Sequence, residues 1–110
     1  LHTGLDFRAE TGTPARATGA GRVVTAEYSG GYGNLVEIDH GGGLTTRYGH
    51  LSAFAVAPGE RVEAGQVVGR TGSTGRSTGA HLHYETRING EPVNPVRFLN
   101  AGKLLARQGG

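Results

Sequence analysis

Residues 34–48, with the sequence NLVEIDHGGGLTTRY, form two short β-prone runs on either side of three glycines. The first run alternates apolar and polar residues up to His40, and the second returns from Leu44 to Tyr48. Alternation with a period of two is typical of a strand with one buried face, and a glycine cluster between two such runs is typical of a turn. The stretch therefore predicts an antiparallel β-hairpin that turns at residues 41–43.

The same kind of short, β-rich run recurs at residues 21–28, 66–70 and 81–87. After the last run, Asn89-Gly90 is a strong turn signal, and the prolines that follow indicate the end of regular structure. We therefore expect a mainly β protein, a small glycine-rich domain built from an antiparallel β-sheet.

Only two stretches could be helical, residues 51–56 and the last dozen residues, which form a short C-terminal helix or tail from about residue 95 to residue 107. No apolar stripe with a 3.6-residue period runs longer than that. Residues 17–24 and 63–68 resemble each other, since each has a turn of small residues followed by paired valines. This similarity suggests a duplicated, hybrid barrel-like motif within the sheet.

The composition limits the possible functions. The chain has 110 residues, enough for one domain with a modest core, and 21 of them are glycine. The net charge is +2, and the basic residues are scattered, so we expect neither a nucleic-acid partner nor a basic membrane patch. No apolar stretch approaches the roughly 20 residues of a transmembrane helix. Because the chain starts at Leu1-His2, with a candidate ligand at position 2, we expect it to be a fragment of a longer or processed protein.

Histidines are the side chains with the clearest chemical potential. The chain has five of them and no cysteine, so a transition-metal site would need imidazole and carboxylate ligands. Two histidines and one aspartate would fill three positions of a tetrahedral zinc site and leave the fourth for water. An open position of this kind is a feature of catalytic zinc, so the pattern favours a zinc hydrolase. The five are His2, His40, His50, His81 and His83.

The His81-Leu82-His83 run lies on a predicted strand, where residues two apart share one face at a separation of about 6.5 Å. One imidazole would then bind a metal while the other reaches a water or substrate, and Leu82 would point into the core. Taken alone, the run fits a solvent-facing pair on an edge strand equally well. Glu85 shares the same face, either as a partner that fixes a histidine tautomer or as a surface carboxylate.

The other candidates have alternatives of their own. His2 and Asp6 lie four apart around a glycine and can converge on one ion, or they are a frayed terminus and a turn residue. His50 is interpreted either as a residue of the metal site or as a histidine that only makes hydrogen bonds at the end of a strand. His40 is expected to flank a turn outside the site. Residues 71–79 lack the Gly-Lys-Ser/Thr ending of a phosphate-binding loop. They are therefore interpreted as a flexible loop at the rim of the site, facing the substrate.

The order of these motifs resembles one known family. His-x-x-x-Asp is followed by Gly-Tyr-Gly-Asn-Leu-Val, then Tyr-Gly-His-Leu, then Gly-x-Thr-Gly and His-Leu-His. This order is similar to that of the lysostaphin-like (LytM-type) zinc metalloendopeptidases of bacterial cell walls, over residues 2–98. The resemblance implies a peptidase domain over residues 1–98 and a tail over residues 99–110. It also implies one Zn²⁺ held by His2, Asp6 and His83, with His50 and His81 as catalytic residues.

By this resemblance the expected activity is zinc-dependent hydrolysis of peptide bonds in peptidoglycan stem peptides or cross-bridges. The expected location is the periplasm, the cell envelope or the exterior, with a targeting segment on the parent protein. One alternative is a non-catalytic domain of the same type that binds cell wall or regulates a partner hydrolase. Another is a lipoyl, biotinyl or sugar-phosphotransferase barrel. Against it, the chain's one lysine, Lys103, lies in the tail, and Asp6 is not a ligand that phosphotransfer needs.

Overall fold

The computed structural model describes residues 4–95, which form antiparallel strands and one short 3₁₀ turn. The expectation of a mainly β domain is confirmed, while the predicted C-terminal helix or tail lies outside the described residues. The elements are β1 (Leu5–Arg8), β2 (Pro14–Arg16), β3 (Gly21–Ser29), η1 (Gly30–Tyr32), β4 (Gly33–Gly41), β5 (Leu44–Phe54), β6 (Arg61–Val62), β7 (Val67–Thr71), β8 (His81–Ile88) and β9 (Glu91–Val93).

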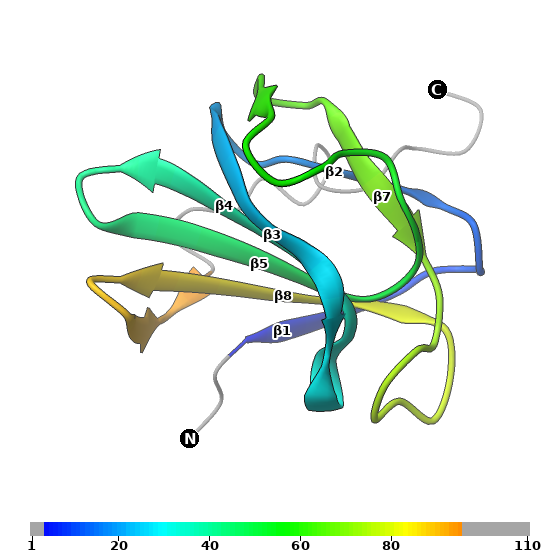
Figure 1. Cartoon of the computed structure of the whole chain (residues 1–110). Coiled ribbons are helices and arrows are strands. Elements are labelled where there is room, and N and C mark those ends of the chain that lie inside the picture. The colour runs from blue at the N-terminus through cyan, green and yellow to red at the C-terminus, as the bar shows by residue number, and fades with distance from the viewer. Residues whose placement is uncertain (1–3, 96–110) are drawn as a thin grey trace.

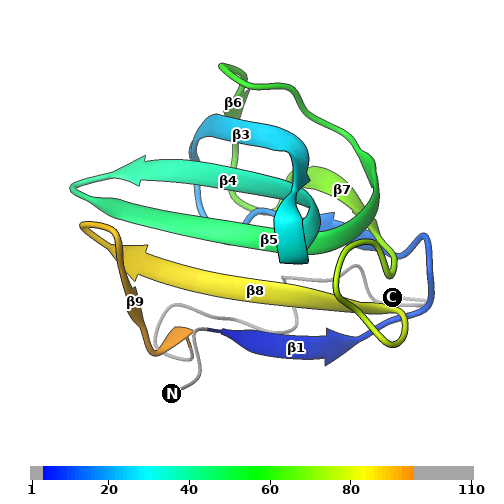
Figure 2. The ribbon, with the colours of Figure 1, turned by 60° about the horizontal axis from the view of Figure 1, so that its bottom comes forward.

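All nine strands belong to one sheet, whose main path runs in the order β1-β8-β5-β4-β3-β6 (Figures 1 and 2). Around this path, β7 pairs with both β2 and β5, and β9 pairs with β8. The first strand in sequence therefore lies beside the eighth, and the eighth beside the fifth. This order brings residues from the beginning, middle and end of the chain to neighbouring strands.

The predicted hairpin is present, because β4 and β5 pair up to Gly41 and Leu44. Gly42 and Gly43 have φ values of 62° and 84°, a region that favours glycine. The runs predicted at residues 21–28, 66–70 and 81–87 correspond to β3, β7 and β8. Asn89 and Gly90 form the predicted turn, also with positive φ.

The structure differs from two local interpretations of the sequence. Residues 51–56, one of the two stretches that could be helical, are not a helix, because β5 continues through Phe54, where Leu51 pairs with Thr71 and Phe54 with Gly69. The apolar run there is too short for its periodicity to separate helix from strand, and pairing with β7 decides the outcome. Regular structure also continues past Asn89-Gly90, since β9 contains Pro92. A proline is tolerated there because β9 is a short edge strand.

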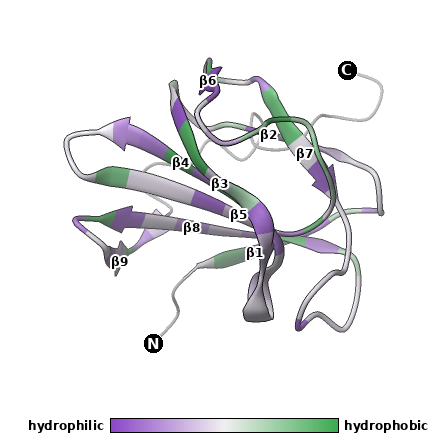
Figure 3. Ribbon diagram, in the orientation of Figure 1, coloured by the Kyte–Doolittle hydropathy of each residue, from purple (hydrophilic) through white to green (hydrophobic). Residues whose placement is uncertain are grey.

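The core is formed by inward-facing residues of the strands, and Figure 3 shows hydrophobic segments on β3 and β7. Leu82 is fully buried, as its place between two histidines predicted. The two similar sequence segments lie side by side: the Ala17 amide donates to the Gln66 carbonyl at 2.9 Å, and the Gly65 amide donates to the Ala17 carbonyl at 2.8 Å. The other fully buried apolar residues include Val23, Val36, Ile38, Tyr48, Leu51, Val62, Val68 and Tyr84.

Tyr48 of β5 and Tyr84 of β8 pair across the sheet with ring centroids 5.5 Å apart. The Thr18 hydroxyl contacts both of their hydroxyls, at 3.2 and 3.1 Å. Burial raises the pKa of Tyr48 to about 12, so this hydroxyl stays neutral. The polar cluster holds β5 and β8 together directly behind the residues of the candidate site.

His40 belongs to the same cluster. Its Nδ1 donates to the Ala20 carbonyl at 2.8 Å, so in the neutral ring Nε2 accepts from the Thr46 hydroxyl at 2.7 Å. Thr46 in turn contacts the Tyr48 hydroxyl. His40 therefore links strands of the fold and does not join the other histidines.

Candidate active site

Three strands bring the candidate site residues together. Asp6 on β1 lies opposite His83 on β8, and Gly49 on β5 lies opposite His83 from the other side. The Asp6 Oδ1 atom is 2.8 Å from His83 Nδ1 and 3.3 Å from His81 Nε2. One carboxylate oxygen thus approaches both histidines, which share a strand face as their two-residue spacing predicted.

His50 occupies the point where β5 changes partners. Gly49 is the last residue of β5 that pairs with β8, and Leu51 is the first that pairs with β7. The register with β4 shifts at the same point, which marks a β-bulge, and His50 has a φ of 63°. Bulges re-aim side chains, and strained backbone is concentrated at functional sites. The bulge places the His50 ring 4.7 Å from the His81 ring and 5.8 Å from the His83 ring, between centroids.

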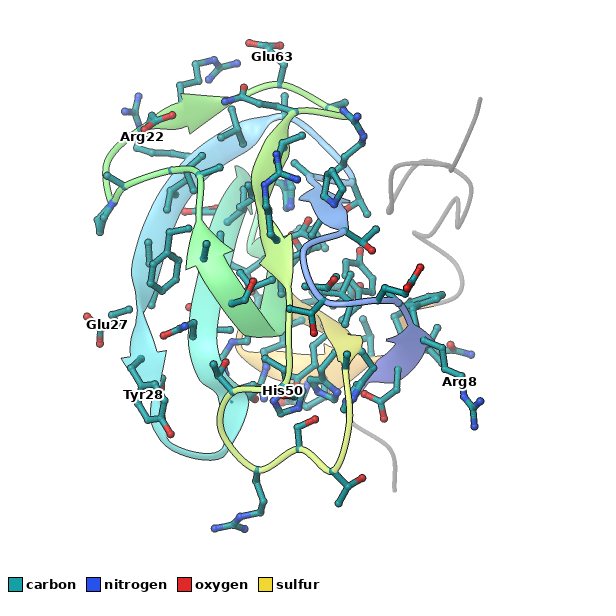
Figure 4. All side chains as sticks on the ribbon, turned by 90° about the vertical axis from the view of Figure 1, so that its right-hand side faces the viewer. Arg8, Arg22, Glu27, Tyr28, His50 and Glu63 are labelled. Carbon is teal, nitrogen blue, oxygen red and sulfur yellow. The ribbon has the colours of Figure 1, made fainter. Side chains whose placement is uncertain are left out.

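The β7–β8 loop (residues 72–80) holds two of these histidines through its main chain, and it crosses beside His50 in Figure 4. His50 Nδ1 donates to the Thr74 carbonyl at 2.7 Å, and His81 Nδ1 donates to the Gly79 carbonyl at 2.9 Å. A carbonyl oxygen only accepts, so each ring carries a proton on Nδ1, and a neutral His50 leaves its Nε2 unprotonated. Burial lowers the pKa of His50 and favours this neutral form.

His83 is held on its other side by a buried carboxylate. Its Nε2 lies 2.8 Å from the Glu85 Oε2 atom, and the Glu85 side chain is only 1% exposed. Burial alone would raise the pKa of Glu85, but hydrogen bonds from His83, Tyr32 and Arg87 outweigh it and lower the pKa to about 2. Of the two functions left open for Glu85, the structure supports the partner that fixes a histidine tautomer.

Tyr32 of η1 contacts both Glu85 and the His83 ring. Its hydroxyl donates to Glu85 Oε1 at 3.1 Å and accepts from Arg47 at 3.1 Å, while its ring lies 5.9 Å from the His83 ring. Arg87 pairs with the same Glu85 oxygen at 3.0 Å. Glu85 is therefore fixed by Tyr32 of η1 and Arg87 of β8, and it fixes His83.

The β7–β8 loop is fastened to the rest of the site, although its sequence predicted a flexible rim. The Thr74 hydroxyl donates to the Leu51 carbonyl at 2.7 Å and accepts from the Asn34 amide at 3.1 Å. Gly33, with a φ of 70°, lies so close that an added Cβ would overlap the Thr74 backbone. This tight contact aims the Thr74 carbonyl at His50.

Gly33→Ala is therefore expected to lower the free energy of unfolding by about 2 kcal/mol or more, from backbone strain and the overlap with Thr74. Gly41→Ala is the matched control. Gly41 also has positive φ, but an added Cβ there meets nothing within 4 Å, so only the strain of about 1 kcal/mol is expected. Denaturant unfolding of both variants measures the difference, and equal losses would contradict the close contact.

Two pockets have histidines of the candidate site in their linings. The first, of about 310 Å³, is lined by Gly31, Tyr32, His50, Arg76, His83 and Glu85. The second, of about 870 Å³, includes Asp6, Arg8, Thr78 and His81 in its lining. In Figure 4 Arg8 and His50 lie towards the same end of the molecule, and Arg22 and Glu63 lie at the opposite end.

The structure thus gathers Asp6, His50, His81 and His83 in one place, while the predicted ligand His2 lies outside the described residues. Within residues 4–95, no three histidine or carboxylate side chains form a ready group for a metal ion. Sequence reasoning missed Tyr32 and the two loop carbonyls. An aromatic residue among glycines was the available signal for Tyr32, whereas a main-chain carbonyl leaves no signal in the sequence.

Comparison with known proteins gives the family of this fold and site. A model of peptidase family M23 matches residues 1–95. The chain belongs to peptidase family M23. Among curated M23 relatives, the DD-carboxypeptidase/endopeptidase Mpg of Neisseria meningitidis serogroup B is 58% identical over 96 residues, which are 87% of this chain. The match spans only 22% of the length of Mpg.

Solved structures agree with the assignment to M23. The catalytic domain of lysostaphin from Staphylococcus simulans superposes with a TM-score of 0.84 at 38% identity, covering 89% of this chain and 78% of that one. A zinc-containing peptidase from Vibrio cholerae gives a TM-score of 0.81 at 39% identity, covering 84% of this chain and 28% of that one. The expected resemblance to lysostaphin-like peptidases is confirmed.

Proposed function

We propose that this chain is the catalytic domain of a zinc-dependent endopeptidase that hydrolyses DD peptide bonds of peptidoglycan. The observation that carries the proposal is the pair of histidines, His50 and His81, whose Nδ1 atoms are held by loop carbonyls and whose rings lie beside the Asp6–His83 pair. The family and the names of the relatives support the reaction class and the substrate.

The donor atoms present fit a zinc ion. Asp6 Oδ1 and His83 Nδ1 lie 2.8 Å apart on adjacent strands, and the bond from His83 Nε2 to Glu85 leaves Nδ1 as the ligand atom. The third ligand in this proposal is His2. When bound, zinc would supply a Lewis acid that polarises the scissile carbonyl and lowers the pKa of a coordinated water.

The histidines supply the proton chemistry. Neither has a helix-borne glutamate beside it, so imidazole takes the place of the base found in His-Glu-x-x-His peptidases. One of His50 and His81 accepts a proton from the attacking water on its Nε2 atom, and the other, protonated on Nε2 as well as Nδ1, donates a hydrogen bond to the oxyanion that develops on the substrate carbonyl. Their rings are held by fixed carbonyls, so little reorganisation is needed when charge develops.

Cleavage of purified cell wall tests the proposal. The chain is incubated with peptidoglycan that has direct DD cross-links and, separately, with peptidoglycan that has glycine bridges, and the products are identified by mass spectrometry. We expect DD cross-linked dimers to be converted to monomers with a gain of one water. Intact dimers in the presence of zinc would contradict the proposal.

The location follows from the substrate. Peptidoglycan lies outside the cytoplasmic membrane, so we propose that the parent protein acts in the periplasm, the cell envelope or the exterior. Among residues 4–95, no helix is long and apolar enough to cross a membrane.

Glu85→Gln is expected to weaken zinc binding by roughly 10- to 100-fold, the usual effect of removing a carboxylate behind a ligating histidine. The amide keeps the shape of the buried side chain but not its charge. Glu37→Gln is the matched control, because Glu37 pairs with Arg47 at 3.1 Å in the same network and does not contact His83. Competition with a fluorescent zinc chelator measures both affinities. Equal affinity in the two variants would show that Glu85 does not support His83.

A further inference from the structure

Arg76 projects from a fixed point beside the histidines. Its amide donates to the Gly31 carbonyl at 2.9 Å, which ties this part of the β7–β8 loop to η1. Arg76 lines the 310 Å³ pocket together with His50 and His83, and its side chain is exposed. The main chain is thus anchored while the guanidinium is open to a ligand in the pocket.

The charges of this pocket are unbalanced. Its carboxylate, Glu85, already pairs with Arg87 at 3.0 Å and contacts His83 at 2.8 Å. Among residues 4–95, no carboxylate lies within ion-pair distance of Arg76. The pocket therefore presents a cation beside the histidines that no carboxylate of residues 4–95 neutralises, which favours an anionic group on the substrate.

A DD bond carries such a group at a fixed place. In an amide that joins D-alanine to a second D-centre, the leaving nitrogen is attached to a carbon that also bears a carboxylate. A D-centre is a carbon atom of D configuration. The second one belongs either to a terminal D-alanine or to a diamino acid in a cross-link. Hydrolysis breaks the carbon–nitrogen bond, adds hydroxyl to the carbonyl carbon and hydrogen to the nitrogen, and leaves this carboxylate unchanged.

We infer that Arg76 binds the carboxylate next to the leaving nitrogen and so selects DD bonds at the proposed peptidase site. This inference rests on the proposed function. Guanidinium binds carboxylate through two parallel hydrogen bonds, a geometry that a lysine does not reproduce. The same contact with Arg76 is available to a terminal D-alanine and to a cross-link, because in both the carboxylate is on the carbon attached to the leaving nitrogen. A glycine bridge has no carboxylate at that position.

Matched substrates test the inference on the zinc-loaded chain. One pair is a stem peptide that ends in D-Ala-D-Ala and the same peptide with a C-terminal amide. The second pair is a DD cross-linked dimer with the D-centre carboxylate free or amidated. We expect the wild-type chain to cleave the free-carboxylate member of at least one pair roughly 10- to 100-fold better in kcat/KM, the size of a charged hydrogen-bonded contact. The pair that shows the preference identifies which carboxylate is bound.

Arg76→Gln is expected to lose this preference through a higher KM on the free carboxylate, with unchanged kinetics on the amide. Arg76→Lys should recover part of it. Arg22→Gln removes the same charge at the opposite end of the molecule and is the control (Figure 4).

Different outcomes separate this inference from the proposed function. A preference that survives in Arg76→Gln, or that disappears in Arg8→Gln instead, overturns the inference. So does a wild-type chain that cleaves both members of each pair equally. If neither pair is cleaved at all by the zinc-loaded wild-type chain, the proposed function itself is wrong.

Discussion

Replacing His81 with alanine is expected to lower kcat on a DD cross-linked peptide by roughly 10²- to 10⁴-fold, the range for a lost acid–base or oxyanion-binding group. The His81 side chain is partly exposed, and its removal deletes the hydrogen bond to the Gly79 carbonyl without opening the core. The fold and the bound zinc should therefore persist. Circular dichroism, zinc content and steady-state kinetics of the same preparation separate lost chemistry from lost structure.

His50 needs a different substitution for the same test. Because its φ of 63° is strained for alanine, His50→Asn is the better variant, since asparagine tolerates this region. A decrease in kcat of roughly 10²-fold or more is expected, with zinc retained. Normal turnover in both the His50→Asn and the His81→Ala chains would show that the two histidines are structural.

The second large effect is expected for His83→Ala, which should abolish stoichiometric zinc binding and, with it, activity. His83 offers Nδ1 next to Asp6 while Glu85 holds Nε2, so alanine removes the proposed ligand atom and leaves a buried carboxylate with one contact fewer. His40→Gln is the control, because His40 lies in the separate Thr46–Tyr48 cluster. Elemental analysis compares the two chains. Undiminished zinc in His83→Ala would remove His83 from the ligand set.

Much of the fold follows from local sequence patterns. The alternation around Val36 and Ile38 and the glycines at the turn predict the β4–β5 hairpin, and the spacing of His81 and His83 predicts their common face. The shortest strands, β1, β2, β6 and β9, have too few residues to show a period. The sequence of β5 beyond His50 fits a helix as well as a strand, because the strand that pairs with it, β7, is distant in sequence.

The candidate site was less accessible to direct reasoning. Asp6 and His83 are 77 residues apart, and only the sheet order makes them neighbours. The resemblance to a known family supplied that pairing before the structure did. The bulge at His50 and the positions of the Thr74 and Gly79 carbonyls depend on backbone geometry, so no residue type in the sequence predicts them. Tyr32 stood within a recognised motif, but its contact with Glu85 required the folded arrangement.

The dependence of cleavage on zinc tests the central claim most directly. The chain is stripped of metal with a chelator, dialysed and titrated with zinc while mass spectrometry follows cleavage of a DD cross-linked dimer. The account predicts no cleavage by the metal-free chain and a return of activity that reaches its plateau at one zinc per chain. Full cleavage by the metal-free chain, or a zinc-saturated chain that leaves the DD bond intact, would contradict it.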